Sequence, residues 1–499
     1  MKNNQNSVSN PIVLSIEFLL NNQTTTMEVT PELTVLEMLQ SLGMMGTKEG
    51  CGEGDCGACT VALGNMENGK IKYRSVVSCV MPAAQLHKKH LITIEGLSDR
   101  KEIHPVQQAI IDAHGTQCGF CTPGVVMSIF TLLVNEENPS DDTIADYLTG
   151  NLCRCTGYDS ILHAAKLAIK KRDKNFIPKF VVESENKIND IFADYPEVSI
   201  SGNDTASYHI PTTLEQLFKV LETTTDNRTI VSGGTDLLVA IKKADVHYKH
   251  YVDITYLKEV KGIKIENNEL IIGSAVLLTD IEENEFVKEH VPALIDSLSI
   301  MASRQIRSMA TLGGNIANAS PVADTVPPLM AGDGQVILLS AEGTRKIALK
   351  DFYKGYKSKD MKKNEIILGV AMPLKGKNHY SSFLKFSKRK HLDIATANST
   401  IYLVTDDNKD KIISANLVIG GCGPTTIKAV KTEVFLTGKS ISEDTAIEAG
   451  KIASAEVSPM SDVRGSKEYR LALVEAMLLK HFLKLFPEKF CMTESGKEV

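Results

Sequence analysis

Cysteine is the residue whose spacing in this sequence points most directly to chemistry. The chain has ten cysteines, and eight of them lie between residues 51 and 155. They form two sets of four: Cys51, Cys56, Cys59 and Cys79, then Cys118, Cys121, Cys153 and Cys155. A disulfide between Cys153 and Cys155 is unfavourable, because their β-carbons point apart in most backbones. Clustered cysteines in a reducing compartment therefore indicate metal ligands.

The first set has the spacing C-x4-C-x2-C, with a fourth cysteine further along the chain. This is the plant-type [2Fe–2S] ferredoxin spacing, in which three thiolates reach the cluster from one loop. Glycines at 50, 52, 54 and 57 let such a loop curl and bring its N–H groups near the sulfides. A structural zinc site is the alternative, but zinc sites usually show two short C-x2–4-C knuckles. The pattern favours an iron–sulfur cluster.

Both cysteine pairs of the second set precede predicted helices. Cys121 stands directly before Thr122-Pro123, and Cys155 stands before the helix start at residues 156–159. Helix N-termini carry free N–H groups and partial positive charge, which would stabilise an anionic core. C-x-C alone is a weak signal, but here it completes a second set of four. We therefore expect a second cluster between two helix N-termini.

The elements around the first set read as a small β-rich domain. Residues 11–30 alternate as a hairpin, and a helix at about 34–42 has the capping box Thr34/Glu37 and a stop at Gly43. Short strands are expected near 59–63, 71–79 and 91–95. The domain is assigned to residues 11–96.

Four short helices are expected around the second set. His104-Pro105 opens the first, and the others are predicted at 123–134, 141–150 and 159–171. They make a compact helical domain over residues 97–172. Residues 173–205 are polar, include two prolines and show no clear periodicity, so they are interpreted as a linker.

Two glycine pairs lie in the α/β region that follows. They occur in "TIVSGGTDLLV" (229–239) and "ATLGGNIANASPVAD" (310–324). Paired glycines let backbone N–H groups approach a pyrophosphate closely, although an isolated pair is more often an ordinary tight turn. Neither loop has the G-x-G-x-x-G fingerprint of a Rossmann fold. The region is assigned as one domain over 206–375, followed by a C-terminal α/β domain over 376–499.

The bulk properties set limits on partners and location. Net charge is −6, which gives no indication of nucleic-acid or anionic-membrane binding. The N-terminal stretch does not resemble a signal peptide, and no apolar run approaches ~20 residues, so a cytoplasmic location is expected. Cys422 and Cys491 are interpreted as inert thiols, the first of them buried.

The segments "CGEGDCGACTV", "HPVQQAIIDAHGTQCGFCTPGVVMS" and "LTGNLCRCTGY" resemble the iron–sulfur modules of the xanthine dehydrogenase family of molybdenum hydroxylases. The resemblance covers most of residues 11–170 and all eight cysteine positions. It implies an α+β multidomain protein with a β-grasp [2Fe–2S] ferredoxin domain and a four-helix [2Fe–2S] domain. It also implies that the helical cluster lies next to a molybdopterin cofactor, with Gln117 and Cys155 approaching the pterin.

The same resemblance covers the glycine-pair region. It implies an FAD domain of the vanillyl-alcohol-oxidase type over 206–375 and a C-terminal domain like that of the CO dehydrogenase flavoprotein over 376–499. The FAD contacts that it implies are Ile230, Val231, Ser232, Gly233, Gly234, Thr235, Asp236, Thr311, Leu312, Gly313, Gly314, Asn315, Asp324, Ile367 and Lys385.

Two features of this region have alternative interpretations. Asp324 could instead cap the helix that begins with "TVPPLM", and residues 388–390, "KRK", read equally well as a solvated basic patch. Asp393 is a candidate near a nicotinamide site.

The resemblance implies a function in electron transfer. The chain ends after the flavin and C-terminal modules, so we expect the iron–sulfur/FAD small subunit of a split xanthine dehydrogenase, in a hetero-oligomer with a molybdopterin-binding large subunit. Electrons from purine oxidation would cross the helical cluster and then the ferredoxin cluster to FAD, and NAD⁺ would take a hydride. No catalytic side chain is assigned to this chain.

Two other readings remain open at this point. One is a self-sufficient NADH-dependent iron–sulfur flavoprotein reductase without a molybdenum partner. The other is a pair of zinc-stapled modules on an inert α/β domain.

Overall fold

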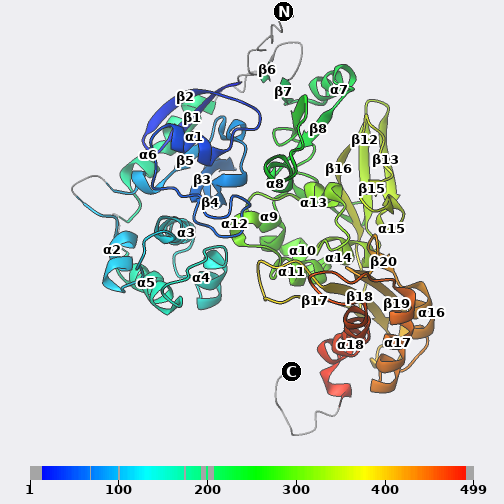
Figure 1. The fold of residues 1–499 in the computed structure, drawn as a ribbon. Coiled ribbons are helices and arrows are strands. Elements are labelled where there is room, and N and C mark those ends of the chain that lie inside the picture. Colours follow the sequence, from blue (N-terminus) through cyan, green and yellow to red (C-terminus); the bar gives the residue numbers. More distant parts are fainter. Residues whose placement is uncertain are drawn as a thin grey trace, which may run out of the picture. The chain divides into compact units, whose positions relative to one another are not determined.

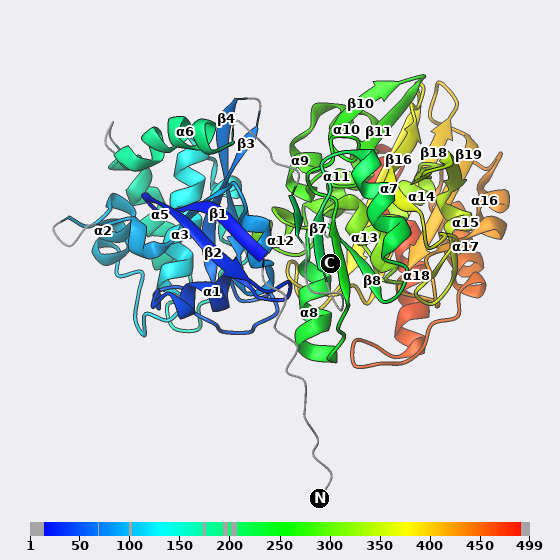
Figure 2. The same cartoon turned by 90° about the horizontal axis from the view of Figure 1, so that it is seen from above.

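The computed structural model describes residues 14–67, 69–98, 102–172, 176–192, 198–200 and 207–490. The chain forms two compact units (Figures 1 and 2). Unit 1 comprises Met1–Lys258 together with Ser303–Ala310, and unit 2 comprises Glu259–Ala302 and Thr311–Val499. No helix among the described residues is both long enough and apolar enough to span a bilayer.

The N-terminal part of unit 1 is a five-stranded sheet in the order β2-β1-β5-β3-β4. β1 pairs antiparallel with β2 and parallel with β5, and α1 begins at the capping box that the sequence predicted. Leu14, Ile16 and Phe18 alternate along β1 and are all fully buried. The elements are β1 (Leu14–Leu20), β2 (Gln23–Val29), α1 (Val35–Ser41), β3 (Thr60–Glu67), β4 (Lys70–Val77), η1 (Ser78–Val80), η2 (Ala83–Leu86), β5 (His90–Ile92) and η3 (Ile94–Gly96).

Four helices follow, as the sequence predicted. They are α2 (Pro105–Asp112), α3 (Thr122–Asn135), α4 (Asp141–Leu148) and α5 (Asp159–Lys170). α3 is buried on nearly all sides, since an unbroken run of its residues from Gly124 to Leu133 is shielded from solvent. A helix that is apolar all round must lie inside a domain, and α3 packs against both α4 and β3.

The expectation of an aperiodic stretch over 173–205 is corrected for its described residues. They contain α6 (Lys179–Phe192) and a strand, β6 (Val198–Ile200). Val181 and Ile188 of α6 are buried, and the Ser184 hydroxyl lies 3.2 Å from the Tyr73 hydroxyl of β4. The many polar residues of α6 obscured this narrow apolar stripe in the sequence.

Unit 1 also contains a second, four-stranded sheet in the order β6-β7-β9-β8. β7, β9 and β8 are parallel, as helical crossovers through α7 and α8 require. The elements are β7 (Ser207–Ile210), α7 (Leu214–Thr223), β8 (Arg228–Val231), α8 (Thr235–Ala244) and β9 (His250–Asp253), together with the short helix α12 (Arg304–Arg307).

Unit 2 has two larger antiparallel sheets. The first has the order β10-β11-β16-β12-β13 and the second the order β17-β18-β19-β20. Its strands are β10 (Ile263–Glu266), β11 (Glu269–Gly273), β12 (Gln335–Ser340), β13 (Gly343–Ala348), β14 (Tyr353–Gly355), β15 (Ser358–Lys359), β16 (Ile366–Pro373), β17 (His379–Phe386), β18 (Ala397–Thr405), β19 (Ile412–Gly420) and β20 (Ile427–Lys428).

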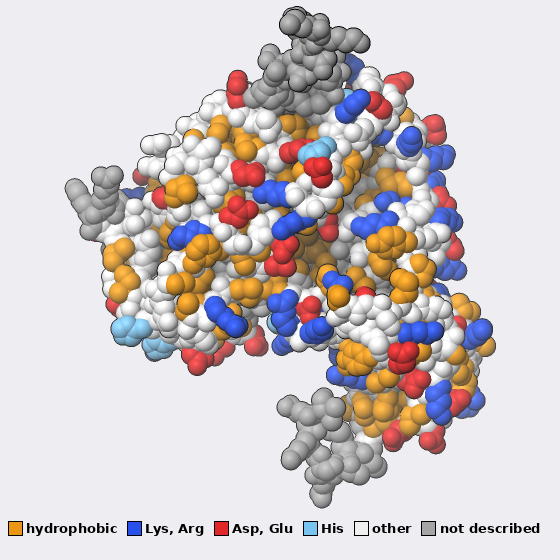
Figure 3. Space-filling model, in the orientation of Figure 1, with side chains coloured by type: hydrophobic (Ala, Val, Ile, Leu, Met, Phe, Trp, Pro, Cys, Tyr) orange, Lys and Arg blue, Asp and Glu red, His pale blue; other side chains and the backbone are white. Residues whose placement is uncertain are grey.

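Helices cover these sheets. α16, α17 and α18 share one apolar core with β17, β18 and β19 (Figure 1). The helices are α9 (Leu278–Glu283), α10 (Glu285–His290), α11 (Pro292–Leu298), α13 (Leu312–Asn318), α14 (Val326–Ala331), α15 (Leu349–Phe352), α16 (Val430–Leu436), α17 (Glu443–Glu456), α18 (Lys467–Leu485) and η4 (Pro487–Lys489). Positive and negative side chains are interspersed on the visible face of unit 2, as on an ordinary solvated surface (Figure 3).

Candidate cofactor sites

The structure brings the first four predicted cysteines together. Cys59 and Cys79 are buried, whereas Cys51 and Cys56 are partly accessible. Hydrogen bonds among the clustered thiols lower the pKa of Cys51 and raise the pKa of Cys56 and Cys79. Such bonds require the sulfur atoms to be neighbours.

The loop that carries Cys51 directs backbone N–H groups at a sulfur atom and leaves no room for a side chain at Gly50. The backbone N–H groups of Glu53 and Asp55 donate to Cys51 Sγ over 3.4 and 3.3 Å, the type of bond that stabilises a thiolate ligand. A β-carbon on Gly50 would lie 2.8 Å from Cys56 Sγ. These donors and this close approach match what a [2Fe–2S] cluster needs.

The second set is arranged around two helix starts, as predicted. Cys121 is the N-cap residue of α3, and Tyr158, three residues after Cys155, is the N-cap residue of α5. Cys118 is hydrogen-bonded to Cys155, and Cys121 to Cys153. Burial, assisted by Cys153, raises the pKa of the Cys121 thiol to about 12.

The outer edge of this set is open to solvent. Cys118 and Cys155 are exposed, and Gln117 Nε2 donates to the Cys155 carbonyl over 3.2 Å. The two residues for which the sequence implied contact with a pterin are therefore neighbours at an exposed position.

Within the described residues, no group of three or more His, Cys, Asp or Glu side chains is placed to hold a single metal ion.

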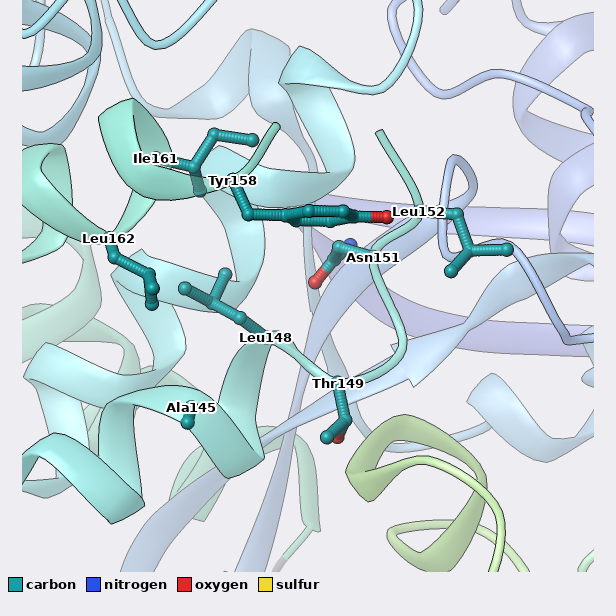
Figure 4. A pocket seen from close by; sticks show the side chains of 8 residues that line it. All are labelled: Ala145, Leu148, Thr149, Asn151, Leu152, Tyr158, Ile161 and Leu162. Carbon is teal, nitrogen blue, oxygen red and sulfur yellow. The ribbon is translucent and has the colours of Figure 1, made fainter. Parts of the chain in front are cut away.

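A cavity of about 250 Å³ lies beside the second set, between α4 and α5 (Figure 4). Its lining is mainly apolar: Ala145, Leu148, Thr149, Asn151, Leu152, Tyr158, Ile161 and Leu162. Tyr158 has a φ of 74°, which is unusual for a bulky residue, and its hydroxyl accepts from the Cys153 N–H over 3.1 Å. No spacing in the sequence marks Tyr158, because its positive φ is visible only in the folded chain.

The first glycine pair lies in unit 1, at the turn from β8 into α8. Ile230 and Val231 end the strand, and Gly234 is the N-cap residue of α8, with a φ of 74°. Ser232 O accepts from Gln85 Nε2, so the turn is tied to the ferredoxin part of the same unit. Thr235 and Asp236 form the first turn of α8, where free N–H groups favour an anion.

The second glycine pair lies in unit 2, in the first turn of α13. Thr311 is the N-cap residue, and its Oγ1 accepts from Gly314 N over 3.2 Å. Gly313 packs so closely on Ser274 that an added β-carbon would lie 2.4 Å from the Ser274 β-carbon. Ser274 Oγ is buried and has no hydrogen-bond partner within the described part of the chain. An orphaned hydroxyl beside a glycine pair is compatible with a bound polar group.

Asp324 and Lys385 form a buried ion pair in unit 2, with Nζ 2.7 Å from Oδ2. Asn398 Nδ2 donates to the other carboxylate oxygen over 2.9 Å. Burial raises the pKa of the Asp324 carboxyl, although Lys385 acts in the opposite direction. Thr325 is the N-cap residue of α14, so the alternative reading of Asp324 as the helix cap is wrong.

The remaining described candidates belong to unit 2. Asn315 Oδ1 accepts from the Thr325 hydroxyl over 2.6 Å, and Ile367 is buried on β16. Residues 388–390 are exposed, and Asp393 Oδ2 accepts from the Arg389 N–H over 3.0 Å. Cys422 is fully buried as expected, and Cys491 lies outside the described residues.

Four family models match the chain in succession. They are the 2Fe-2S iron-sulfur cluster binding domain at residues 18–84, the [2Fe-2S] binding domain at 93–166, the FAD binding domain in molybdopterin dehydrogenase at 202–375 and the CO dehydrogenase flavoprotein C-terminal domain at 382–485. The fold class that the sequence predicted is confirmed by these matches.

Similar curated proteins include a xanthine dehydrogenase of Emericella nidulans, 32% identical over 87% of this chain and 36% of the relative. Xanthine dehydrogenase 1 of Arabidopsis thaliana is 31% identical over 90% of this chain and 38% of the relative. Aldehyde oxidase 1 of Bos taurus is also 31% identical, over 92% and 38%. The chain thus spans little more than a third of the length of these relatives.

Solved structures with a similar fold include two further oxidoreductases. A chain of the cyanide-inactivated Cu,Mo-CO dehydrogenase has a TM-score of 0.53 at 25% identity, covering 56% of this chain and 97% of that one. A chain of quinoline 2-oxidoreductase from Pseudomonas putida 86 has a TM-score of 0.53 at 27% identity, covering 58% and 99%.

The domain matches place this chain in the molybdenum hydroxylase family of oxidoreductases. Within that family it is an electron-transfer component with two 2Fe–2S domains and an FAD-binding domain.

Proposed function

We propose that the chain relays electrons from a molybdopterin-binding partner, through two [2Fe–2S] clusters and FAD, to NAD⁺. The observation that carries this proposal is the order of the parts: two cysteine modules, an FAD-binding domain and a flavoprotein C-terminal domain follow one another on one chain. When bound, the clusters pass single electrons and the flavin can hold two, so flavin is the natural exit to a hydride acceptor.

The eight cysteines are the proposed cluster ligands. Cys51, Cys56, Cys59 and Cys79 would hold one cluster, and Cys118, Cys121, Cys153 and Cys155 the other. The N–H groups at the Cys51 loop and at the start of α3 would offset the negative charge of the clusters. No residue of this chain is proposed as catalytic.

The two glycine-pair turns and the buried lysine are the proposed FAD contacts. The set is Ile230, Val231, Ser232, Gly233, Gly234, Thr235, Asp236, Thr311, Leu312, Gly313, Gly314, Asn315, Asp324, Ile367 and Lys385. Within unit 1, the start of α8 at Gly234 offers free N–H groups of the kind that bind a pyrophosphate. The domain boundaries given from the sequence remain part of this proposal.

Xanthine is the proposed substrate class of the complete enzyme, with the purine bound on the partner. The support is the similarity to xanthine dehydrogenases at 31–32% identity, although an aldehyde oxidase is equally similar. Of the two open alternatives, the self-sufficient reductase is not favoured, because the domain models and the similar proteins belong to molybdenum hydroxylases.

The experiment is anaerobic purification of the tagged chain from its native host, followed by analysis for iron, flavin and molybdenum. We expect a molybdenum-containing polypeptide to co-purify and xanthine to bleach the flavin absorption, with recovery on addition of NAD⁺. Cys51→Ser and Cys118→Ser should each remove iron, whereas Cys422→Ser, at a buried thiol outside both sets, should retain it. A colourless, iron-free chain, or a flavoprotein that never associates with molybdenum, would contradict the proposal.

A further inference from the structure

A short segment of the flavin-binding sequence lies among the cysteine modules. Residues 303–310 fall within the match to the FAD-binding domain, yet they belong to unit 1. Arg304 and Arg307 of α12 both form ion pairs with Asp146 of α4, over 2.9 and 2.6 Å. Arg307 is completely buried and Asp146 is 25% exposed, so salt screens this anchor less than it would screen an ion pair on the surface.

Gln305 lies between these two arginines and is itself fully buried. Its Nε2 donates to Asn151 Oδ1 over 3.0 Å, to Ser128 Oγ over 3.1 Å and to the Tyr147 carbonyl over 3.0 Å. A reversed amide would place the Gln305 oxygen against two acceptors, so the orientation is fixed by its surroundings. Gln305 therefore holds the oxygen end of the Asn151 amide.

The nitrogen end of the same amide faces the first cysteine loop. Asn151 Nδ2 donates to the Gly57 carbonyl over 3.1 Å, and the next N–H, of Leu152, donates to the Cys56 carbonyl over 3.0 Å. Leu152 is bonded directly to Cys153. One hydrogen bond and a short length of backbone thus connect Cys56 of the first set with Cys153 of the second.

Glycines line the contact between the two loops, so a larger side chain at these positions would push the backbones apart. A β-carbon on Gly57 would lie 2.3 Å from the Gly150 carbonyl oxygen, and one on Gly124 would lie 2.1 Å from the Gly57 carbonyl oxygen. The two backbones therefore come closer than any residue with a β-carbon would permit. The hydrogen bond from Asn151 Nδ2 to the Gly57 carbonyl is the part of this contact that a side-chain substitution can change.

We propose that Gln305 is a positioning residue for electron transfer between the two clusters: through Asn151 it sets the approach of the loop carrying Cys56 to the loop carrying Cys153. This inference rests on the proposed function, in which both cysteine sets hold [2Fe–2S] clusters. It gives the flavin-binding sequence a role at a junction that contains none of the proposed flavin contacts.

The test uses Gln305→Met in the full chain within its native complex. Methionine keeps the length of the side chain but cannot donate to Asn151. We expect iron and labile sulfide to match the wild type, the rate of electron redistribution between the clusters after rapid reduction to fall several-fold, and the magnetic interaction between the two reduced clusters to change in the low-temperature EPR spectrum.

Asn135→Leu is the matched control. Asn135 Nδ2 also links the helical domain to the ferredoxin sheet, through the Tyr73 carbonyl over 2.8 Å, but it lies at the opposite end of α3 from Cys121. We expect this variant to lower the melting temperature without changing the redistribution rate or the EPR interaction. A purely structural role of Gln305 would give the same result as this control.

Ser128→Ala is the milder second variant, because it removes one hydroxyl that donates to Asn151 Oδ1 over 2.7 Å. If Gln305→Met loses iron, the rate of electron redistribution and the EPR interaction are measured in Ser128→Ala instead, and these values test the positioning role. Unchanged rate and EPR interaction, or loss of iron in both variants, would overturn the positioning role. A wild-type chain without two reducible clusters would instead overturn the proposed function.

Discussion

The buried ion pair of Asp324 with Lys385 could not be predicted from either residue alone. Its position next to a helix start suggested a cap or a cofactor anchor, but its carboxylate faces Lys385 of β17, and both side chains are almost completely buried. Two opposite charges out of water stabilise one another only while both are present. The pair is therefore a point at which unit 2 is sensitive to single substitutions.

Lys385→Met should destabilise unit 2 by about 3–5 kcal/mol, because it leaves an uncompensated buried carboxylate. Adding Asp324→Leu to the same chain should recover part of that loss. Urea unfolding followed by circular dichroism measures both, and flavin content in the same samples tests the proposed FAD contact. A single variant as stable as the wild type would show that the carboxyl does not need its partner.

His481 predicts how unit 2 responds to acid. The imidazole is fully buried between the hydroxyls of Ser382 and Ser399, and burial lowers its pKa to about 3. An unfolded histidine has a pKa of about 6.5, so the unfolded chain takes up this proton first. The stability from His481 is complete above about pH 6.5 and is lost as pH falls, by about 1.4 kcal/mol per pH unit.

The measurement is urea unfolding at a series of pH values for the wild type and for His481→Gln. Glutamine can still hydrogen-bond to the serine hydroxyls but cannot bind the proton. The variant should therefore show a shallower loss of stability between about pH 6 and about pH 4. Parallel pH curves for the two proteins would mean that His481 is protonated in the folded state.

At the scale of elements, the contact between the two cysteine loops depends on Gly57. It has a φ of 65°, and its missing β-carbon would collide with the Gly150 carbonyl. Gly119, in the other cysteine loop, has a φ of 80° but open space around it. Both positions require left-handed backbone, which costs an ordinary residue about 1–2 kcal/mol. The collision at Gly57 comes in addition to that cost.

Gly57→Ala should therefore lose both stability and iron, whereas Gly119→Ala should lose about 1–2 kcal/mol of stability and retain its iron. Thermal unfolding and iron analysis of the two variants compare them directly. Equal losses in both would mean that the backbone conformation matters and the close approach to Gly150 does not.

Much of this element structure could be predicted, because local signals carry it. The capping box at Thr34 and the proline at the start of α3 set helix starts that the structure confirms. The cysteine spacing likewise predicted two groups of four. These features depend on residues a few positions apart, which a single sequence displays.

The features that were missed depend on distant contacts. Nothing near Gln305 in the sequence indicates Asn151 as its partner, since 154 residues separate them. α6 was missed because its low overall hydrophobicity hid an apolar stripe that does recur at helical spacing. The pairing of Lys385 with Asp324 spans two elements 61 residues apart. Such contacts follow from topology and are visible only in the folded chain.

At the scale of the whole molecule, the chain divides its chemistry between two units. All eight clustered cysteines belong to unit 1, whereas the buried pair of Asp324 and Lys385 and the buried His481 belong to unit 2. A ligand that binds a folded unit stabilises that unit by mass action. Loss of bound iron should therefore change the stability of unit 1, and loss of the ion pair should change the stability of unit 2.

Scanning calorimetry at constant FAD concentration should resolve two transitions. Removal of iron by reduction and chelation should lower the transition of unit 1, because the clusters bind only its folded state. Lys385→Met should lower the other transition and leave the iron-sensitive one in place, which assigns both peaks without reference to their order. If iron removal and Lys385→Met shifted the same peak, the two units would unfold as one cooperative body.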